Sequence, residues 1–273
     1  MSDRRFASVA RVFGEAACRQ LWDAHVVVVG IGGVGSWAAE ALARSGVGHL
    51  TLIDLDHIAE SNINRQVHAL TSTLGAAKCE VMAARIRDIS PDITVNAVDE
   101  FVEPGQEDVL IPGGADVVID AIDAVAAKAS LIAWCVAHGR RIISCGAAGG
   151  RRDPLQLQVQ DLAHTSGDAL LSSVRARLRR HHGFARASTL LPAAKRTSRT
   201  RSAPPFGVMA VYSPEQISGL SVQPGLEAGM PLACAGYGSL VTVTAAMGLV
   251  AAGRAMTWLT SRPTTQIKPG REG

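Results

Sequence analysis

Residues 25–54 have the sequence HVVVVGIGGVGSWAAEALARSGVGHLTLID, which predicts a strand, a helix and a second strand in succession. The β-branched run His25–Val29 is typical of a strand buried within a parallel sheet. Ser36–Arg44 is rich in alanine and predicts a helix, and the apolar run Leu50–Ile53 predicts the next strand. Two parallel strands joined by a helix form a βαβ unit, so we expect an α/β fold.

Four glycines, Gly30, Gly32, Gly33 and Gly35, occupy the turn between the first strand and the helix. Glycine lets the backbone approach a phosphate closely, and the helix N-terminus behind the turn attracts negative charge. Asp54 follows the second strand about 20 residues further on, where it can accept hydrogen bonds from ribose hydroxyls. This context predicts a nucleotide-binding turn, although a tight turn without a ligand can carry the same glycines.

The remainder of the chain continues the alternation of strands and helices. Leu155–Val159 alternates apolar and polar residues and predicts an antiparallel addition. We therefore expect an α/β fold of Rossmann-like type, with a doubly wound, mostly parallel sheet, added antiparallel strands and a C-terminal helical segment. Further strands are predicted at Ile93–Val98, Val117–Ile119 and Arg141–Ser144, and further helices at Ala76–Ile89, Gln106–Leu110 and Ala126–His138.

The domain organisation is expected to be simple. We predict one domain over residues 1–273, with its core at 11–165, a basic helix and flexible linker at 170–207, and an apolar C-terminal helix at 233–260. Ala228–Gly253 holds no charged residue and is long enough to span a bilayer. Its proline, glycines and alanine-rich composition favour a buried helix, or a helix at a dimer interface, over a membrane span. Peripheral membrane association through this segment stays open.

The charge is unevenly distributed along the chain. The net charge is +3, but no acidic residue lies between Asp168 and Glu215, and that stretch carries nine basic residues. A basic segment on an otherwise acidic chain suggests a polyanionic partner such as a nucleic acid. A solvated loop is an equally good interpretation of the charge alone.

The five cysteines are scattered, and no two have C-x-x-C spacing. This pattern argues against a disulfide framework and a structural zinc site, and it fits a reducing cytosol. Met1–Arg19 has no apolar stretch of the kind found in signal peptides. We therefore expect a cytoplasmic protein.

Polar residues beyond the second strand indicate which nucleotide binds. Asn62, Asn64, Arg65 and Lys78 supply two amides and two cations near the glycine turn, and a triphosphate needs such charges more than the pyrophosphate of NAD does. Asp120 and Asp123 end a later strand, at the sheet edge where ligands bind, and one of the two carboxylates can hold Mg²⁺. Taken singly, Lys78 could be an exposed helix charge and Asp123 a helix cap. An NAD-dependent oxidoreductase leaves the whole set unexplained, so we expect ATP and Mg²⁺.

Val26–Gly35, Asp54–Gln66, Lys78 and Asp120–Asp123 resemble the motifs of the adenylation domain that ubiquitin-activating enzymes share with the bacterial adenylyltransferases of sulfur carriers. The resemblance implies a catalytic set of Arg65, Lys78 and Asp123, with Asp123 as the metal ligand. A homodimer is implied too, since an arginine from a second subunit often completes such sites; Arg11 and Arg5 are the candidates. The nucleotide-binding residues that we expect are Gly30, Gly32, Gly33, Gly35, Asp54, Asn62, Asn64, Arg65 and Lys78.

Further segments point to one branch of this superfamily. Gly30–Arg44, Asn64–Leu70, Ser144–Gly150, Asp161–Ala163 and Cys234–Gly238 are similar to tRNA threonylcarbamoyladenosine dehydratases. This likeness implies ATP-dependent dehydration, by cyclisation, of N6-threonylcarbamoyladenosine in tRNA through an acyl-adenylate. The alternative is an adenylyltransferase that activates the C-terminus of a ubiquitin-like sulfur carrier. That branch typically holds zinc in C-x-x-C pairs, which this chain lacks.

Several residues have more than one role open to them. His68 is a candidate for substrate contact or proton transfer, and a structural role fits it equally well. Arg151 and Arg152 follow a glycine-rich loop and are candidates for contact with tRNA phosphate. The attacking groups in the implied reaction belong to the substrate, so Cys145 and Cys234 are expected to be dispensable, with Cys234 as the candidate reactive cysteine. A non-catalytic adaptor that docks a sulfur-acceptor protein is a third alternative.

Overall fold

The computed structural model describes residues 4–186, 203–217 and 238–261. In these residues seven strands form one sheet in the order β3-β2-β1-β4-β5-β7-β6, and every pair is parallel except β6 with β7. The strands are β1 (His25–Val29), β2 (His49–Ile53), β3 (Thr94–Val98), β4 (Val117–Asp120), β5 (Arg141–Cys145), β6 (Gln158–Asp161) and β7 (Met209–Tyr212).

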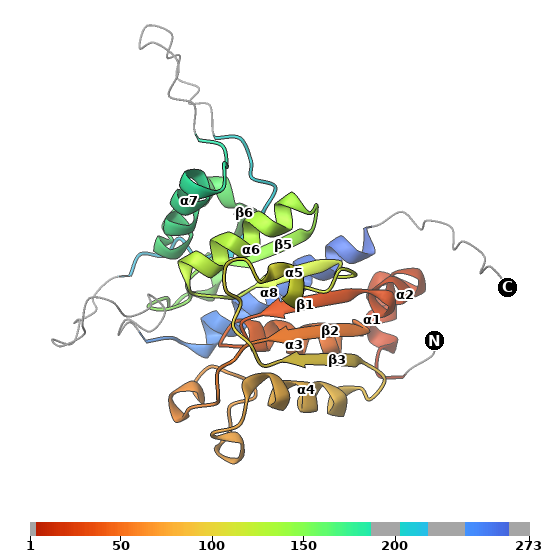
Figure 1. Ribbon diagram of the computed structural model, residues 1–273. Helices are drawn as coiled ribbons and strands as arrows, with labels where there is room; N and C mark the ends of the chain where they lie inside the picture. Colours follow the sequence, from red (N-terminus) through yellow and green to blue (C-terminus); the bar gives the residue numbers. More distant parts are fainter. Residues whose placement is uncertain (1–3, 187–202, 218–237, 262–273) are drawn as a thin grey trace, which may run out of the picture.

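Helices cover both faces of the sheet (Figure 1). Figure 1 shows α4 beside β3 and α7 at the other end of the sheet, near β6. The described helices are α1 (Ala7–Phe13), α2 (Glu15–Asp23), α3 (Gly35–Arg44), α4 (Lys78–Ile89), α5 (Glu107–Leu110), α6 (Val125–Ala137), α7 (Ala169–His181) and α8 (Val241–Thr260).

The valines of β1 explain why both faces need cover. Val26 and Val28 belong to a hydrophobic cluster with side chains of α3, α4 and α8, whereas Val27 and Val29 belong to a second cluster with side chains of α5, α6 and α7. Successive side chains of a strand point to opposite faces, so a strand between two helical layers must be apolar throughout. The run of four valines is therefore the signature of a central strand.

The predicted Rossmann-like sheet is confirmed, and each predicted parallel strand lies within one residue of its observed bounds. The predicted antiparallel addition exists, but it starts at Gln158 rather than Leu155. The carboxylate of Asp153 accepts a hydrogen bond from the N–H of Leu155 at 2.9 Å and begins a 3₁₀ turn over Pro154–Gln156. That turn removes the first residues of the predicted segment from the strand.

Some elements were not predicted from the sequence. β7 has four residues and inserts between β5 and β6, and α1 and α2 precede the glycine turn. The apolar C-terminal helix begins at Val241, while residues 233–237 lie outside the described part of the chain. No helix in the described residues is both long and apolar enough to span a bilayer.

α8 packs along α3 at a position where only glycine fits. A Cβ on Gly248 would overlap the carbonyl oxygen of Val34 and would lie 2.9 Å from the backbone nitrogen of Ala38. Five residues further along α8, a Cβ on Gly253 would meet nothing within 4 Å. The close approach at Gly248 fixes α8 against the helix that follows the glycine turn.

The variants Gly248→Ala and Gly253→Ala are expected to change stability in opposite directions. Alanine in place of a helical glycine raises the free energy of unfolding by about 0.5–1 kcal/mol where space permits, which we expect for Gly253→Ala. Overpacking should lower it by about 1–3 kcal/mol in Gly248→Ala. Urea unfolding of both variants measures the two changes. Equal shifts in the two variants would contradict a tight contact between α8 and α3.

Candidate active site

A cavity of about 510 Å³ lies at the carboxyl ends of the parallel strands. Its lining includes Val29 at the end of β1, Ile53 and Asp54 at the end of β2, and residues 121–124 and 146–149 after β4 and β5. β1 lies between β2 and β4, where the sheet order changes direction. Open α/β sheets bind ligands at such a switch point, so the position itself marks the cavity as the candidate site.

The glycine turn forms one wall of this cavity, which Gly30, Gly32 and Gly33 line directly. Gly30 has a φ of +85°, and a Cβ there would lie 2.9 Å from the carbonyl oxygen of Ala121. A Cβ on Gly35 would overlap the carbonyl oxygen of Gly30. The turn therefore needs glycine at both ends, and it brings the N-terminus of α3 beside the cavity, where a phosphate is favoured.

Asp54 braces the turn and also lines the cavity. Its carboxylate accepts hydrogen bonds from the N–H of Ile31 at 2.6 Å and from the N–H of Asp56 at 2.9 Å. Burial raises the pKa of the Asp54 carboxyl, although the positive charge of Lys78 and the two backbone donors oppose that shift. The oxygen atoms have lone pairs left for hydroxyl donors, as a ribose would offer.

Lys78 begins α4 and reaches the cavity from the far side of Asp54. Its side chain is almost fully buried, and Nζ lies 2.6 Å from an Asp56 carboxylate oxygen. Both side chains line the cavity. The ion pair with Asp56 keeps the Lys78 ammonium beside the cavity. A bound phosphate could replace the Asp56 carboxylate as the partner of this ammonium.

Arg65 lies against the glycine turn. A Cβ on Gly33 would be 3.2 Å from the Arg65 Cγ, and Trp37 of α3 donates a hydrogen bond to the Arg65 carbonyl at 2.9 Å. The Arg65 guanidinium donates to the carbonyl of Ser61 at 2.7 Å and to the side-chain oxygen of Asn64 at 3.0 Å. Backbone and side chain of Arg65 are thus both held by hydrogen bonds, and the residue lines the cavity.

The two predicted asparagines have different surroundings. Asn62 lines the cavity, and its side-chain oxygen accepts a hydrogen bond from the N–H of Ala59 at 3.1 Å. Asn64 is outside the cavity lining and donates to the carbonyl of Ser239 at 3.0 Å. Asn64 therefore joins the segment before α8 to the Arg65 loop rather than facing the cavity.

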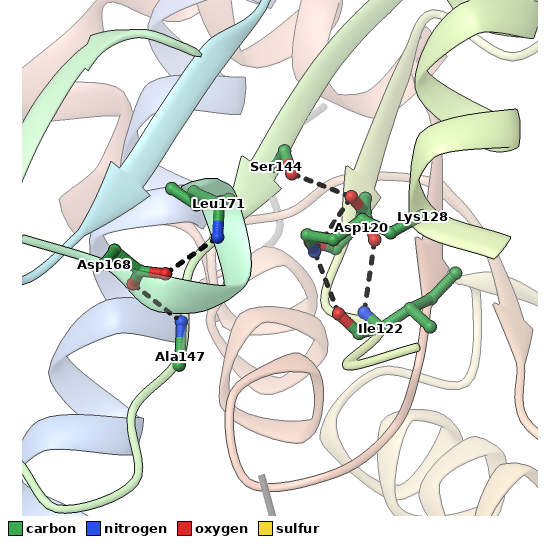
Figure 2. Close-up of polar contacts among 7 residues, drawn as sticks. All are labelled: Asp120, Ile122, Lys128, Ser144, Ala147, Asp168 and Leu171. Atoms are coloured by element: carbon green, nitrogen blue, oxygen red, sulfur yellow. Dashed lines mark hydrogen bonds and ion pairs between the residues drawn. The ribbon is translucent and has the colours of Figure 1, made fainter. Parts of the chain in front are cut away.

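The acidic segment after β4 divides into one buried and one accessible carboxylate. Asp120 is fully buried, where Lys128 Nζ lies 2.9 Å away and the Ser144 hydroxyl donates at 2.8 Å (Figure 2). Asp123 lines the cavity. Only Asp123 of the two could reach a metal ion bound with a nucleotide.

Mg²⁺ would find a sparse protein ligand set in this cavity. The described residues contain no group of three or more His, Cys, Asp and Glu side chains arranged to hold a metal ion. Mg²⁺ is usually bound by one or two carboxylates together with substrate phosphates and water. Asp123 beside the glycine turn fits that kind of shared site, in which the nucleotide supplies the remaining oxygens.

The loop after β5 forms the opposite rim of the cavity and is tied to α7. Asp168 caps α7 by accepting from the N–H of Leu171 at 2.9 Å, and its other oxygen accepts from the N–H of Ala147 at 2.9 Å (Figure 2). A Cβ on Gly146 would overlap Asp168, so glycine permits this approach. Leu170 of α7 also lines the cavity. The basic helix thus starts at the rim of the site.

Three residues predicted to contact substrate lie outside the cavity lining. His68 is 1% exposed, and neither ring nitrogen has a hydrogen-bond partner among the described residues. Arg151 is 3% exposed and donates to the Gly167 carbonyl at 3.1 Å. Arg152 is exposed, and its backbone N–H donates to Glu215 at 3.0 Å. A buried His68 favours the structural role that the sequence had left open.

The candidate arginines of the N-terminal segment also lie outside the cavity of their own protomer. Arg5 lines a surface hollow with Arg44 and Arg85, and Arg11 lines another with Trp22. Cys234, the candidate reactive cysteine, lies outside the described residues.

Some cavity residues escaped the sequence analysis. Asp56 is the partner of Lys78, and its spacing of two from Asp54 was a signal that could have been used. Gln66 lines the cavity, and its buried side-chain oxygen has no partner among the described residues. Phe101 and Val102 line the cavity from the segment after β3, where no motif marks them. With Ile53 they offer an apolar surface suited to a base.

A doubly wound sheet, a glycine turn and convergent cations at the switch point define a nucleotide-binding α/β protein. The chain belongs to the ThiF family, whose model matches residues 4–271.

Within this family, the chain is similar in both sequence and structure to one group of enzymes. The tRNA threonylcarbamoyladenosine dehydratase of Haemophilus influenzae is 41% identical over 92% of each chain, and that of Escherichia coli K12 is 42% identical over 93% of this chain and 92% of its own. The crystal structure of the E. coli enzyme, TcdA, in complex with ATP superposes with a TM-score of 0.79 over 94% of this chain and 93% of that one. The predicted likeness to the dehydratase branch is confirmed.

The variant His68→Leu should flatten the pH dependence of stability. Burial, and then the charges of Lys78 and Arg85, lower the pKa of His68 to about 4, so the folded ring stays neutral where an unfolded histidine is protonated. As the pH falls from 7 to 5, the unfolded state alone gains this proton, which lowers wild-type stability by about 2 kcal/mol. Urea unfolding gives the free energy of unfolding at pH 7 and at pH 5. The drop between the two pH values should be smaller in the variant than in wild type by about 2 kcal/mol. An unchanged difference would mean that the folded ring takes up the proton.

Proposed function

We propose that this protein catalyses the ATP-dependent dehydration of N6-threonylcarbamoyladenosine in tRNA. The observation that carries the proposal is the likeness to E. coli TcdA, which is 42% identical over 94% of this chain and has been solved with ATP and with AMP. Those two complexes fit adenylylation, in which ATP enters and AMP leaves. Sulfur-carrier adenylyltransferases are more distant, since the E. coli enzyme for ThiS is 33% identical over 55% of this chain.

ATP occupies the cavity with its base against the apolar side and its phosphates along the glycine turn. Ile53, Phe101 and Val102 support this orientation at the base end, and Asp54 accepts from the ribose hydroxyls. The N-terminus of α3 lies toward the phosphates, where the helix dipole favours negative charge.

Arg65 and Lys78 stabilise the negative charge that develops on the α-phosphate and the departing pyrophosphate. Both cations are already oriented, by Ser61 and Asn64 in one case and by Asp56 in the other. Groups that need no reorganisation during the reaction stabilise its transition state best. Asp123 would hold Mg²⁺, which would supply positive charge against the phosphates.

The reaction proceeds in two displacements. The threonyl carboxylate of the modified base attacks the α-phosphorus of ATP, forming an acyl-adenylate and releasing pyrophosphate. The carbamoyl group of the same base then attacks the activated carbonyl, the ring closes and AMP departs with the carboxylate oxygen. The net change in the tRNA is the loss of one water, and the protein contributes position and charge.

The described cysteines support a mechanism without an enzyme nucleophile. Cys145 ends β5 near the cavity rim but is 1% exposed, and burial raises the pKa of its thiol to about 12. Burial raises the pKa of Cys79 and Cys135 to about 12 as well. A thiol is reactive as its thiolate, so these three are poor nucleophiles at neutral pH.

tRNA approaches over α7 and the rim of the cavity. This helix carries Arg175, Arg177, Arg179 and Arg180, and its last turn contains three basic residues, Arg179, Arg180 and His181. Asp168 ties its first turn to the loop that lines the cavity. Basic side chains bind the phosphate backbone, while the site itself takes the modified base. The protein acts in the cytoplasm as a homodimer in which the partner subunit's Arg11 or Arg5 completes the site.

Mass spectrometry of tRNA nucleosides tests the proposed function. The purified protein is incubated with Mg²⁺, ATP and tRNA that carries N6-threonylcarbamoyladenosine, and the tRNA is then digested. A nucleoside lighter by one water, formed only with ATP and matched by AMP release, is the expected result. Unchanged nucleosides, with pyrophosphate exchange that depends on a small Gly-Gly-tailed protein, would move the assignment to a sulfur-carrier adenylyltransferase.

The variant Arg65→Ala should lower turnover by at least about 100-fold, because losing one preorganised charge stabiliser typically has an effect of that size. Initial rates of AMP release with saturating ATP and modified tRNA measure the loss. Arg87→Ala is the matched control, since Arg87 is an exposed arginine of α4 whose guanidinium donates only to the carbonyl of Val95 among the described residues. Turnover close to wild type in Arg65→Ala would remove Arg65 from the mechanism.

A further inference from the structure

Lys128 is a fully buried lysine behind the wall of the cavity. It belongs to α6, and its Nζ contacts three oxygen atoms of the segment that leaves β4: an Asp120 carboxylate oxygen at 2.9 Å, the Ile122 carbonyl at 2.9 Å and the Asp120 carbonyl at 3.3 Å (Figure 2). Both charged side chains are 0% exposed. Lysine is almost never fully buried without a partner, so these three oxygens account for its position.

The ammonium and the carboxylate together hold both backbone polar groups of one residue, Ile122. The N–H of Ile122 donates to the Asp120 carboxylate at 3.1 Å, and the Ile122 carbonyl accepts from Lys128. Ile122 immediately precedes Asp123, and both residues line the cavity. A substantial rotation of the backbone at Ile122 would break one of these bonds.

Stability alone is a weak reason for such a pair. Removing two charges from water costs several kcal/mol per ion, and apolar residues of similar volume are often neutral or stabilising replacements for a buried ion pair. The Ser144 hydroxyl adds a third donor to the carboxylate at 2.8 Å, which completes the network. Of these groups, only Lys128 and the Asp120 carboxylate bond the backbone of Ile122, while Ser144 bonds the carboxylate of Asp120 alone.

We propose that Lys128 is a positioning residue for the site: it fixes the Ile122–Asp123 backbone, so that the Asp123 carboxylate is held where a metal–nucleotide complex binds. The inference rests on the proposed function, in which Asp123 is the metal ligand. It assigns Lys128 no contact with ATP or tRNA, since its ammonium is enclosed by Asp120 and Ile122.

The double variant Asp120→Asn/Lys128→Met separates positioning from charge pairing. Lys128→Met alone would leave a buried carboxylate without its counter-ion, and the chain could fail to fold. The double variant removes both charges, and the asparagine oxygen can still accept from the Ile122 N–H. What it lacks, besides the ion pair, is the pair of bonds from Lys128 to the Ile122 and Asp120 carbonyls. Ser144→Ala is the matched control, because it removes a hydrogen bond from the same carboxylate and leaves those bonds in place.

Calorimetry of nucleotide binding is the main measurement, because it needs no turnover. We expect the Kd of the folded double variant for ATP without Mg²⁺ to lie within about threefold of the wild-type value. Its Kd for Mg²⁺-ATP should be at least about tenfold higher than that of wild type, because losing a group that supports a metal ligand typically has an effect of this size. kcat should fall by a similar factor while KM for tRNA stays unchanged. Ser144→Ala should match wild type in all of these values.

Two results would overturn the inference. If the double variant binds Mg²⁺-ATP as tightly as wild type, Lys128 serves only to neutralise Asp120. If hydrogen exchange on the wild-type protein shows the Ile122 amide exchanging as fast as an exposed loop, the peptide is not held, whatever the variants do. A wild-type protein that binds Mg²⁺-ATP but leaves the modified tRNA unchanged would count against the proposed function, and the binding measurement would still decide the role of Lys128.

Discussion

The contact between the two ends of the glycine turn is the constraint on which the rest of the structure depends. Gly35 lies so close to the carbonyl of Gly30 that any Cβ would overlap it, and Gly30 in turn lies against Ala121. This packing sends the chain from the central strand directly into α3. It also brings the N-terminus of α3, the end of β2 and the segment after β4 to a common point, where a phosphate can meet backbone N–H groups.

The charges around that point are oriented before any nucleotide binds. Lys78 is paired with Asp56, and the Arg65 guanidinium is held by the carbonyl of Ser61 and by its neighbour Asn64. Next to the cavity lining, the ion pair of Lys128 and Asp120 holds the backbone of Ile122, the residue before Asp123. Preorganised charge of this kind needs no rearrangement during reaction, which suits chemistry that depends on position and charge stabilisation more than on an enzyme nucleophile.

The fold was largely predictable because its signals are local. Four consecutive valines can only be a strand covered on both faces, and the glycine spacing identifies the turn that follows them. β7 was missed because a four-residue strand beyond a long basic segment has too little periodicity to detect. It becomes a strand by pairing with β5 and β6, which are distant in sequence. The start of β6 differs from the prediction for a local reason: Asp153 caps a 3₁₀ turn over Pro154–Gln156, in spite of the alternation of apolar and polar residues there.

The sequence by itself determined the fold class, the family likeness and the identity of the residues near the phosphates, because each of these follows from residue types at short spacing. The family resemblance already pointed to Asp123, but only the tertiary structure showed that Asp120 is enclosed while Asp123 lines the cavity, and that His68 is buried outside the cavity lining. Burial and pairing depend on elements far apart in the chain: Asp120 is enclosed because α6 brings Lys128 and β5 brings Ser144 to it. The contacts of Asp120 with Lys128 and Ser144 therefore cannot be predicted from a local sequence pattern.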